Sequence, residues 1–298
     1  MAAEEITLAK PRDSMLTGMG KGIIKFGKKK PLGALGAVSL LLIVFAAIFA
    51  PVLATHDPNQ QMGADVRLTA PGSMFWFGSD EFARDIYSRV IYGARISLYV
   101  GILSVSVGTV IGTFLGVASG YLGGAFDLIV QRFVDTLLGF PSLILAILLM
   151  AVLGASLNNV AIAIMIGFIP RLTRVSRSSS LSVKENDYVL AAQALGATSM
   201  RILVRHIIPN CLAPIIVLST GFLGSAIVAE AGLSFLGLGV PPPHPAWGRM
   251  LQNAARTYQE AAPWMTIFPG AALSLAVFGF NLFGDALRDV WDPRLRGT

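Results

Sequence analysis

Charged residues are scarce in this sequence, since Asp, Glu, Lys and Arg make up 13% of its 298 residues. Soluble globular proteins carry about 25% charged residues, whereas 54% of this chain is apolar. With so few ions to face water, a soluble fold is excluded. The single cysteine, Cys211, rules out an internal disulfide, and the 31 glycines lack the three-residue period of collagen.

Long stretches without charge are the main pattern that is present. Five runs contain no Asp, Glu, Lys or Arg: 31–56, 96–126, 136–170, 206–229 and 261–284. A membrane-crossing helix needs about 20 apolar residues, so four of these runs predict one span each. The run 136–170 is too long for one span and too short for two, but turn-forming residues interrupt it at 154–159. We predict two spans there, and hence an all-α integral membrane protein with six transmembrane helices.

The basic residues are distributed unevenly among the connections between these spans. With six spans, 17 of the 23 Lys and Arg fall on the side that holds both termini. Because Lys and Arg are retained on the cytoplasmic side, we expect both termini to be cytoplasmic. The expected segments are a basic N-terminal tail (1–30), a first transmembrane helix (31–56), an outer loop (57–95), a five-helix core (96–288) that includes a cytoplasmic connection (171–208), and a C-terminal tail (289–298).

Catalytic and metal-binding patterns are missing. His56, His206 and His244 lie at or beyond the ends of the predicted spans, so no Ser–His pair is expected inside the membrane. The stretch 22–28 has the spacing of a phosphate-binding loop, but Lys29 replaces the Ser or Thr that holds magnesium. We therefore expect no catalytic residue, no metal site and no cofactor bound by this chain.

Ionisable residues are also missing from the centres of the predicted spans. A charge inside the membrane costs at least about 2.5 to 3.5 kcal/mol and marks ion pathways when it occurs. The nearest ionisable residues are Glu230, at the outer end of the fifth span, and Asp285, at the inner end of the sixth. This pattern argues against an ion-coupled secondary carrier, which stays as the alternative from another functional class.

The connection 171–208 carries helical spacing. Its recurring residues Tyr188, Ala192, Leu195, Ser199 and Ile202 would share one face of a single helix. Alanines cluster about Gly196, so a partner surface could approach this backbone closely. Periodicity alone supports two readings equally, a docking helix for a partner and an amphipathic helix lying on the membrane.

The same segment resembles the EAA loop of ABC-importer permeases. The matching residues are Tyr188-Val-Leu-Ala-Ala-Gln-Ala-Leu-Gly196 and Arg205-His-Ile-Ile-Pro-Asn210. Leu190 stands where this loop usually has Glu and so lacks its carboxylate, and His206 stands where Ile is common. The small-residue pattern around Gly196 is unaffected by either departure.

Further motifs extend the resemblance over about 30–296. The segments 77–98, 230–248 and 280–295 resemble, in order, the sequences entering the second span, following the fifth span and ending the chain in the oligopeptide/dipeptide permease family. The long first outer loop and the C-terminal motif resemble the second of that family's two paired permeases.

The resemblance implies a type I ABC-importer permease fold in the bacterial inner membrane. Such a chain forms half of an alternating-access pathway for di- or oligopeptides, while ATP and Mg²⁺ are bound by partner subunits. The implied partners are a second homologous permease, two ATP-binding subunits, an external solute-binding protein and membrane lipid, without nucleic acid. Nickel chelates, glutathione and oligosaccharides are alternative solutes within the same family.

The resemblance also implies where the functional residues lie. A coupling helix around 188–200 would dock on an ATP-binding subunit, with Arg171, Arg174 and Arg177 near lipid phosphates and the flank of that subunit. Its expected contact residues are Tyr188, Ala191, Ala192, Leu195, Gly196, Ala197 and Arg201.

The translocation path is assigned by position alone. We assign it to Gly221, Ser225, Glu230, Asn281 and Asp285. Small residues near Gly221 either permit tight helix packing or open a path, and packing is favoured. For Asn281 and Asp285, a hydrogen-bonded helix end with Arg288 is the preferred alternative.

Overall fold

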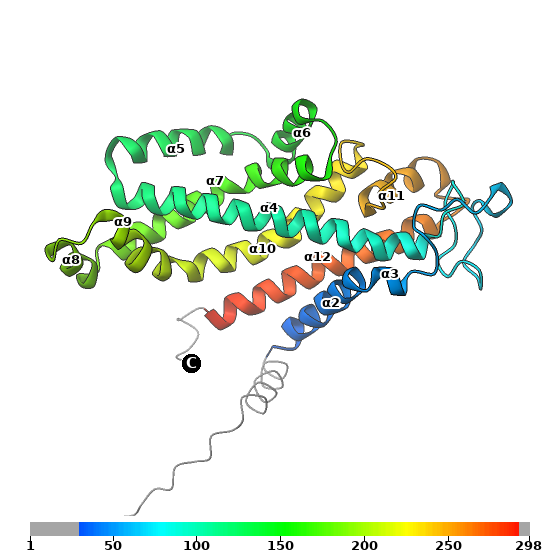
Figure 1. Ribbon diagram of the computed structural model, residues 1–298, viewed down its shortest axis with the longest axis horizontal. Coiled ribbons are helices and arrows are strands. Elements are labelled where there is room, and N and C mark those ends of the chain that lie inside the picture. Colours follow the sequence, from blue (N-terminus) through cyan, green and yellow to red (C-terminus); the bar gives the residue numbers. More distant parts are fainter. Residues whose placement is uncertain (1–29, 292–298) are drawn as a thin grey trace, which may run out of the picture.

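The computed structural model describes residues 30–291, which form an elongated bundle of helices (Figure 1). No strand occurs within these residues, apart from an isolated bridge between Ser79 and Asp85. The expected N-terminal tail before Lys30, its phosphate-loop-like stretch, and residues 292–298 of the C-terminal tail lie outside the described residues. The helices are α2 (Pro31–Ile48), α3 (Ala50–Leu53), η1 (Ala64–Val66), α4 (Ile86–Leu122), α5 (Gly124–Leu138), α6 (Ser142–Leu153), α7 (Leu157–Lys184), α8 (Asp187–Ala194), α9 (Ser199–Ile202), η2 (Leu203–Ile207), α10 (Ile208–Phe235), α11 (Trp247–Asn253), η3 (Ala254–Tyr258) and α12 (Trp264–Trp291).

Five continuous helical segments are long and apolar enough to cross a membrane, and α5 with α6 can form a sixth, broken span. The five are Pro31–Ile48, Ile86–Leu122, Leu157–Lys184, Ser199–Phe235 and Trp264–Asp289. The axes of α5 and α6 meet at 93°. Pro141 explains this break, because proline disfavours helical backbone at the residue before it. Six spans are thus reached only when the bent pair counts as one.

The predicted interruption of the third charge-free run, 136–170, is present between α6 and α7. Gly154 ends α6 with a φ of 79°, a conformation that glycine adopts without a steric penalty. Ser156 then caps α7 by accepting a hydrogen bond from the backbone N–H of Asn159 at 3.1 Å. The short turn lets α7 run back alongside α4.

Four of the helices, α4, α7, α10 and α12, extend beyond the charge-free runs that predicted them. α4 begins at Ile86, where Asp85 caps it by accepting from the Ser88 N–H at 3.0 Å, so the last ten residues of the expected outer loop 57–95 are helical. Within the expected connection 171–208, α7 continues to Lys184, α8 follows from Asp187 to Ala194, and the helix that becomes α10 starts at Ser199. The helices are longer than the runs because charged residues are excluded only from the hydrocarbon layer. A helix can continue beyond that layer into the hydrated interface, where charged residues are tolerated.

A row of glycines on α4 brings α7 into close contact. Gly108, Gly112, Gly116 and Gly120 recur every four residues and so share one helix face. A Cβ atom at Gly112 would lie 2.6 Å from the Cβ of Leu172, and one at Gly116 would lie 2.2 Å from the carbonyl oxygen of Thr173. Such distances show that the two backbones approach as closely as the absence of side chains allows.

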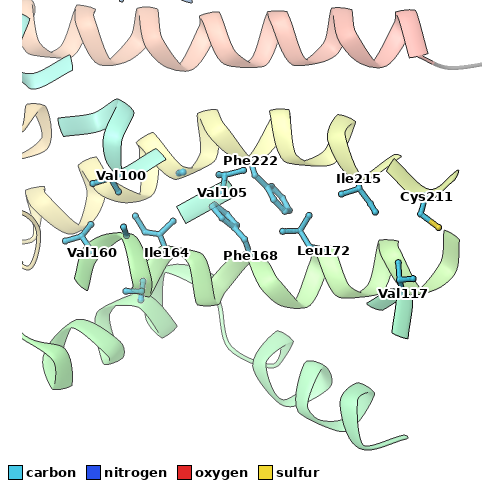
Figure 2. Close-up of a cluster of buried hydrophobic side chains, with 14 of the residues drawn as sticks. Val100, Val105, Val117, Val160, Ile164, Phe168, Leu172, Cys211, Ile215 and Phe222 are labelled. Atoms are coloured by element: carbon cyan, nitrogen blue, oxygen red, sulfur yellow. The ribbon is translucent and has the colours of Figure 1, made fainter. Parts of the chain in front are cut away.

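The main hydrophobic core lies where α4, α7 and α10 meet (Figure 2). Phe168 of α7 stacks on Phe222 of α10 with 4.6 Å between the ring centroids. Val160, Leu172 and Ile215 are fully or almost fully buried around this pair. This stacking ties the position of α10 to that of α7.

The first and last described helices pair with each other. A Cβ atom at Gly36 of α2 would lie 2.8 Å from the Cβ of Leu282 on α12, so the two helices also pack through a glycine. Lys30 donates to Asp289 at 2.6 Å and joins the start of α2 to the end of α12. Both ends therefore lie toward the same end of the bundle as α8 and α9, on the left of Figure 1.

The glycine row makes a prediction that can be tested on one helix. Gly116→Ala should destabilise the detergent-solubilised protein by about 1–3 kcal/mol, because the new methyl group overlaps α7. Gly101→Ala is the matched control on α4, since its Cβ would meet only ordinary contacts, the nearest at 3.5 Å from Ile227. Thermal unfolding of the two variants compares them, and equal stability would contradict the assignment of the seam.

Candidate functional site

The segment between α7 and α10 forms a bent surface at one end of the bundle. α8 ends at Ala194, and Gly196, two residues later, has a φ of +77°. The N–H of Gly196 donates to the carbonyl of Gln193, and the N–H of Ala197 donates to the carbonyl of Ala192. This pair of bonds is a Schellman motif, in which a left-handed glycine stops a helix.

The expected single helix across 188–200 is therefore wrong. The residues Tyr188 and Ile202 belong to two different helices, α8 and α9, and share no continuous face. The periodicity favoured one helix because alanine and leucine are strong helix formers on both sides of Gly196. The left-handed backbone of that glycine overrides the pattern, and the segment changes direction there.

Most of the predicted docking residues face outward from the bundle. Tyr188, Ala191, Leu195, Gly196 and Arg201 are exposed, and the Leu195 side chain is 87% exposed. The structure separates them from Ala192 and Ala197, which are partly buried and pack against the main core. Val189 is fully buried and anchors α8.

The segment is joined to the bundle through one long helix. α9, η2 and α10 run without interruption from Ser199 to Phe235. Within it, Leu203–Ile207 is π-helical, and Pro214 lies inside α10. Both features loosen the regular hydrogen-bond ladder, so they are the points where this helix bends most easily.

A cavity of about 820 Å³ lies between α10 and α12, with Val175 of α7 at its edge. Four of the five residues assigned to the translocation path line this cavity, namely Gly221, Ser225, Asn281 and Asp285. Arg288 also lines it. With Asn210, which also lines it, the cavity combines apolar walls, three neutral hydrogen-bonding side chains and two side chains of opposite charge.

The fifth path residue, Glu230, lies elsewhere. Its side chain is fully buried between α4 and α10 and does not line the cavity. It accepts hydrogen bonds from Ser97 at 3.2 Å and from Ser234 at 2.8 Å. Glu230 thus lies apart from the four cavity-lining residues and joins α4 to α10 from a buried position. The sequence could not reveal it, since the partner Ser97 is 133 residues away.

Two arginines on α7 bind carboxylates of α5. Arg177 forms a two-pronged pair with Asp127, at 2.7 Å from Nε and 2.6 Å from an Nη nitrogen. Arg174 pairs with Asp135. Both arginines thus have anionic partners within the chain, on α5, and their expected contact with lipid phosphates stays a prediction. Bidentate arginine–carboxylate pairs are among the stronger ion pairs and hold α5 on α7.

Residues 57–85, which belong to the expected outer loop, fold over the end of the bundle opposite α8 and α9 (Figure 1). Asp80, Glu81 and Arg89 are buried, and they border a second cavity of about 330 Å³. Arg84 donates to Asp80 at 2.7 Å, and Asn253 donates to Glu81 at 2.7 Å. The loop is therefore a folded cap that contacts the segment leading to α12.

The buried Glu230 predicts a difference between two substitutions. Glu230→Gln keeps a carbonyl acceptor of the same length and should cost less than about 1 kcal/mol of stability. Glu230→Ala removes the acceptor of both serine hydroxyls and leaves a gap, so about 2–4 kcal/mol should be lost. Thermal unfolding in detergent measures both, and indistinguishable variants would speak against the packing role.

Comparison with known families supports the architecture. Residues 108–297 match the family described as binding-protein-dependent transport system inner membrane component. Residues 26–71 match the N-terminal transmembrane domain of oligopeptide transport permease C. A chain from the inward-facing structures of the MetNI methionine ABC transporter has the same fold, with a TM-score of 0.56 at 19% identity, covering 68% of this chain and 96% of that one. The expected type I permease fold is confirmed.

Relatives match nearly the whole length. The dipeptide transport system permease protein of Alkalihalophilus pseudofirmus is 44% identical over 90% of this chain and 88% of that protein. The probable D,D-dipeptide transport system permease protein of Escherichia coli is 41% identical over 100% and 99% of the two chains. A glutathione transport system permease protein of Escherichia coli is 41% identical over 91% and 89%. The chain therefore belongs to the family of binding-protein-dependent transport system inner membrane components, as a multi-pass permease subunit of an ABC importer.

Proposed function

We propose that this subunit imports di- or oligopeptides, and that it forms one half of the translocation pathway with a second homologous permease. The observation that carries the proposal is the continuous helix Ser199–Phe235. It joins the mostly exposed residues 187–201, called the docking segment below, to the cavity between α10 and α12. At 1.5 Å per residue, Ser199 and Gly221 are about 33 Å apart along this helix. A displacement at one end therefore reaches the cavity wall.

The proposed solute follows from the relatives and fits the cavity. The relatives named above are transporters of dipeptides, D,D-dipeptides and glutathione, which share amide groups and charged ends. Ser225 and Asn281 offer neutral hydrogen-bonding groups, and Asp285 and Arg288 offer one charge of each sign. These groups suit a zwitterionic peptide whose side chains vary.

The proposed orientation puts both termini in the cytoplasm. Lys30 and Asp289 join the two ends near α8 and α9, and most Lys and Arg of the sequence fall on this side of the predicted spans. An ATP-binding subunit would dock there, and the folded outer cap would face the external solute-binding protein. ATP is bound and hydrolysed by the partner chains, and this chain performs no bond chemistry.

The proposed coupling is mechanical. Closure of two ATP-binding subunits would draw the docking segments of the two permeases together and displace each long helix. The cavity would then open to the outside, and hydrolysis would return it to the inside. This requires a two-state arrangement that ATP and the docked solute-binding protein bias in the same direction.

The composition of the complex is the first experimental test. Affinity purification of this chain from native membranes, in mild detergent with ATP and vanadate, should recover a second permease and two ATP-binding chains. Proteoliposomes containing that complex and its solute-binding protein should accumulate labelled dipeptides only with ATP. Uptake of nickel chelates or oligosaccharides, with none of peptides, would reassign the solute, and a chain purified alone would contradict the assembly.

The exposed Leu195 gives a second test of docking. Leu195→Asp should leave membrane insertion and thermal stability unchanged, because the side chain is 87% exposed in the isolated chain. If a partner covers Leu195, the new carboxylate is buried without a counter-charge, and co-elution of ATP-binding chains should fall by roughly tenfold or more. Leu195→Met is the matched control that should preserve co-elution. Normal recovery of ATP-binding chains with the Asp variant would remove Leu195 from the interface.

A further inference from the structure

Two glycines on α10 have opposite surroundings. A Cβ atom at Gly224 would lie 2.8 Å from the side-chain oxygen of Asn281, so that glycine is needed for packing against α12. A Cβ atom at Gly221, one turn earlier, would meet no atom within 4 Å. The two glycines on this helix therefore differ in their role. Gly224 allows close packing against α12, whereas Gly221 leaves space open beside it.

Gly221 has no local structural requirement within the described residues. It lies inside α10, and its backbone is not in the left-handed region where glycine is favoured. Glycine in a helix interior costs about 1 kcal/mol relative to alanine. No close contact offsets this cost, so the small size of Gly221 keeps space open in the cavity that it lines.

On the opposite wall of the cavity, α12 also presents a glycine, Gly284. A Cβ atom at Gly284 of α12 would lie 3.6 Å from the backbone nitrogen of Gly221. Ser225, one turn beyond Gly221 on the same face, is exposed and bonds only to the Gly221 carbonyl at 3.4 Å. Around Gly221, the cavity is therefore lined by backbone atoms and small side chains of α10 and α12.

We propose that Gly221 sets the upper size of the solute that this permease passes. A Cβ atom at this position meets no atom within 4 Å, so a larger side chain can extend from it into the cavity that Gly221 lines and narrow the passage. Long peptides lose passage before short ones, because the occupied volume grows with each residue of the solute. This inference rests on the proposed function for its solute class.

A thiol at position 221 tests the proposal after the complex has assembled. The chain has one cysteine, Cys211, which is fully buried, so Gly221→Cys adds a single accessible thiol to this subunit. Methyl methanethiosulfonate then adds a small group, and benzyl methanethiosulfonate adds a large one. Because the side chain grows on the folded complex, a failure to fold cannot produce the result.

The readout is ATP-dependent uptake of dialanine and pentaalanine by proteoliposomes. The benzyl-labelled complex should keep dialanine uptake within about twofold of the unlabelled one and should lower pentaalanine uptake on the order of tenfold or more. The methyl label should have an intermediate effect. The unmutated complex, treated with the same reagents, controls for cysteines on partner chains.

A second variant controls for position on the same helix. Gly232 also lies on α10 but outside the cavity, and a Cβ atom there would make only an ordinary contact, 3.7 Å from Leu143. Gly232→Cys, treated in the same way, should not distinguish the two peptides. Comparison of the labelled variants at 232 and 221 thus distinguishes selection by solute size from a general effect of labelling α10.

Three results would overturn the proposal. These are equal loss of both peptides, no loss of either after complete labelling, and an unreactive thiol at 221 in the assembled complex, which would make this face a contact with the second permease. If the unmutated complex transports another solute and no peptide, the proposed function fails. A size-dependent block by the two labels is then still expected among short and long members of that solute class.

Discussion

The close approach of α7 to α4 is the constraint on which the rest of the arrangement depends. In a membrane, lipid tails are as apolar as the side chains, so helices associate through packing more than through the hydrophobic effect. The glycine row from Gly108 to Gly120 supplies this packing by letting two backbones touch. α7 then positions α10 through the Phe168–Phe222 stack, and α10 forms one wall of the cavity.

Charged side chains in this protein mostly serve contacts between elements. Arg174 and Arg177 hold α5 against α7, and Lys30 ties α2 to the end of α12. The buried Asp80 and Glu81 organise the cap formed by residues 57–85. Because the sequence has few charges, pairing so many of them internally leaves the helices with little charge toward lipid.

The sequence predicted what depends on local pattern. Charge-free runs indicated the spans, Gly154 marked a turn, and the motif around Gly196 pointed to the docking segment. Three features were not predicted, because each depends on contacts between distant residues or on one backbone angle. They are the 93° bend between α5 and α6, the split between α8 and α9, and the burial of Glu230. The glycine row was visible in the sequence as a four-residue repeat, and its spacing alone could have indicated the α4–α7 seam.

The turn at Gly196 has a consequence for how force is transmitted. A straight helix seated in a groove of a partner subunit can rotate about its own axis. The partner can then move without moving the membrane helices that are attached to that helix. A segment that changes direction at Gly196 has two arms, α8 and α9, and a rotation that is free for one arm is blocked by the other. If this segment docks on an ATP-binding subunit as proposed, its two arms would transmit torque as well as displacement.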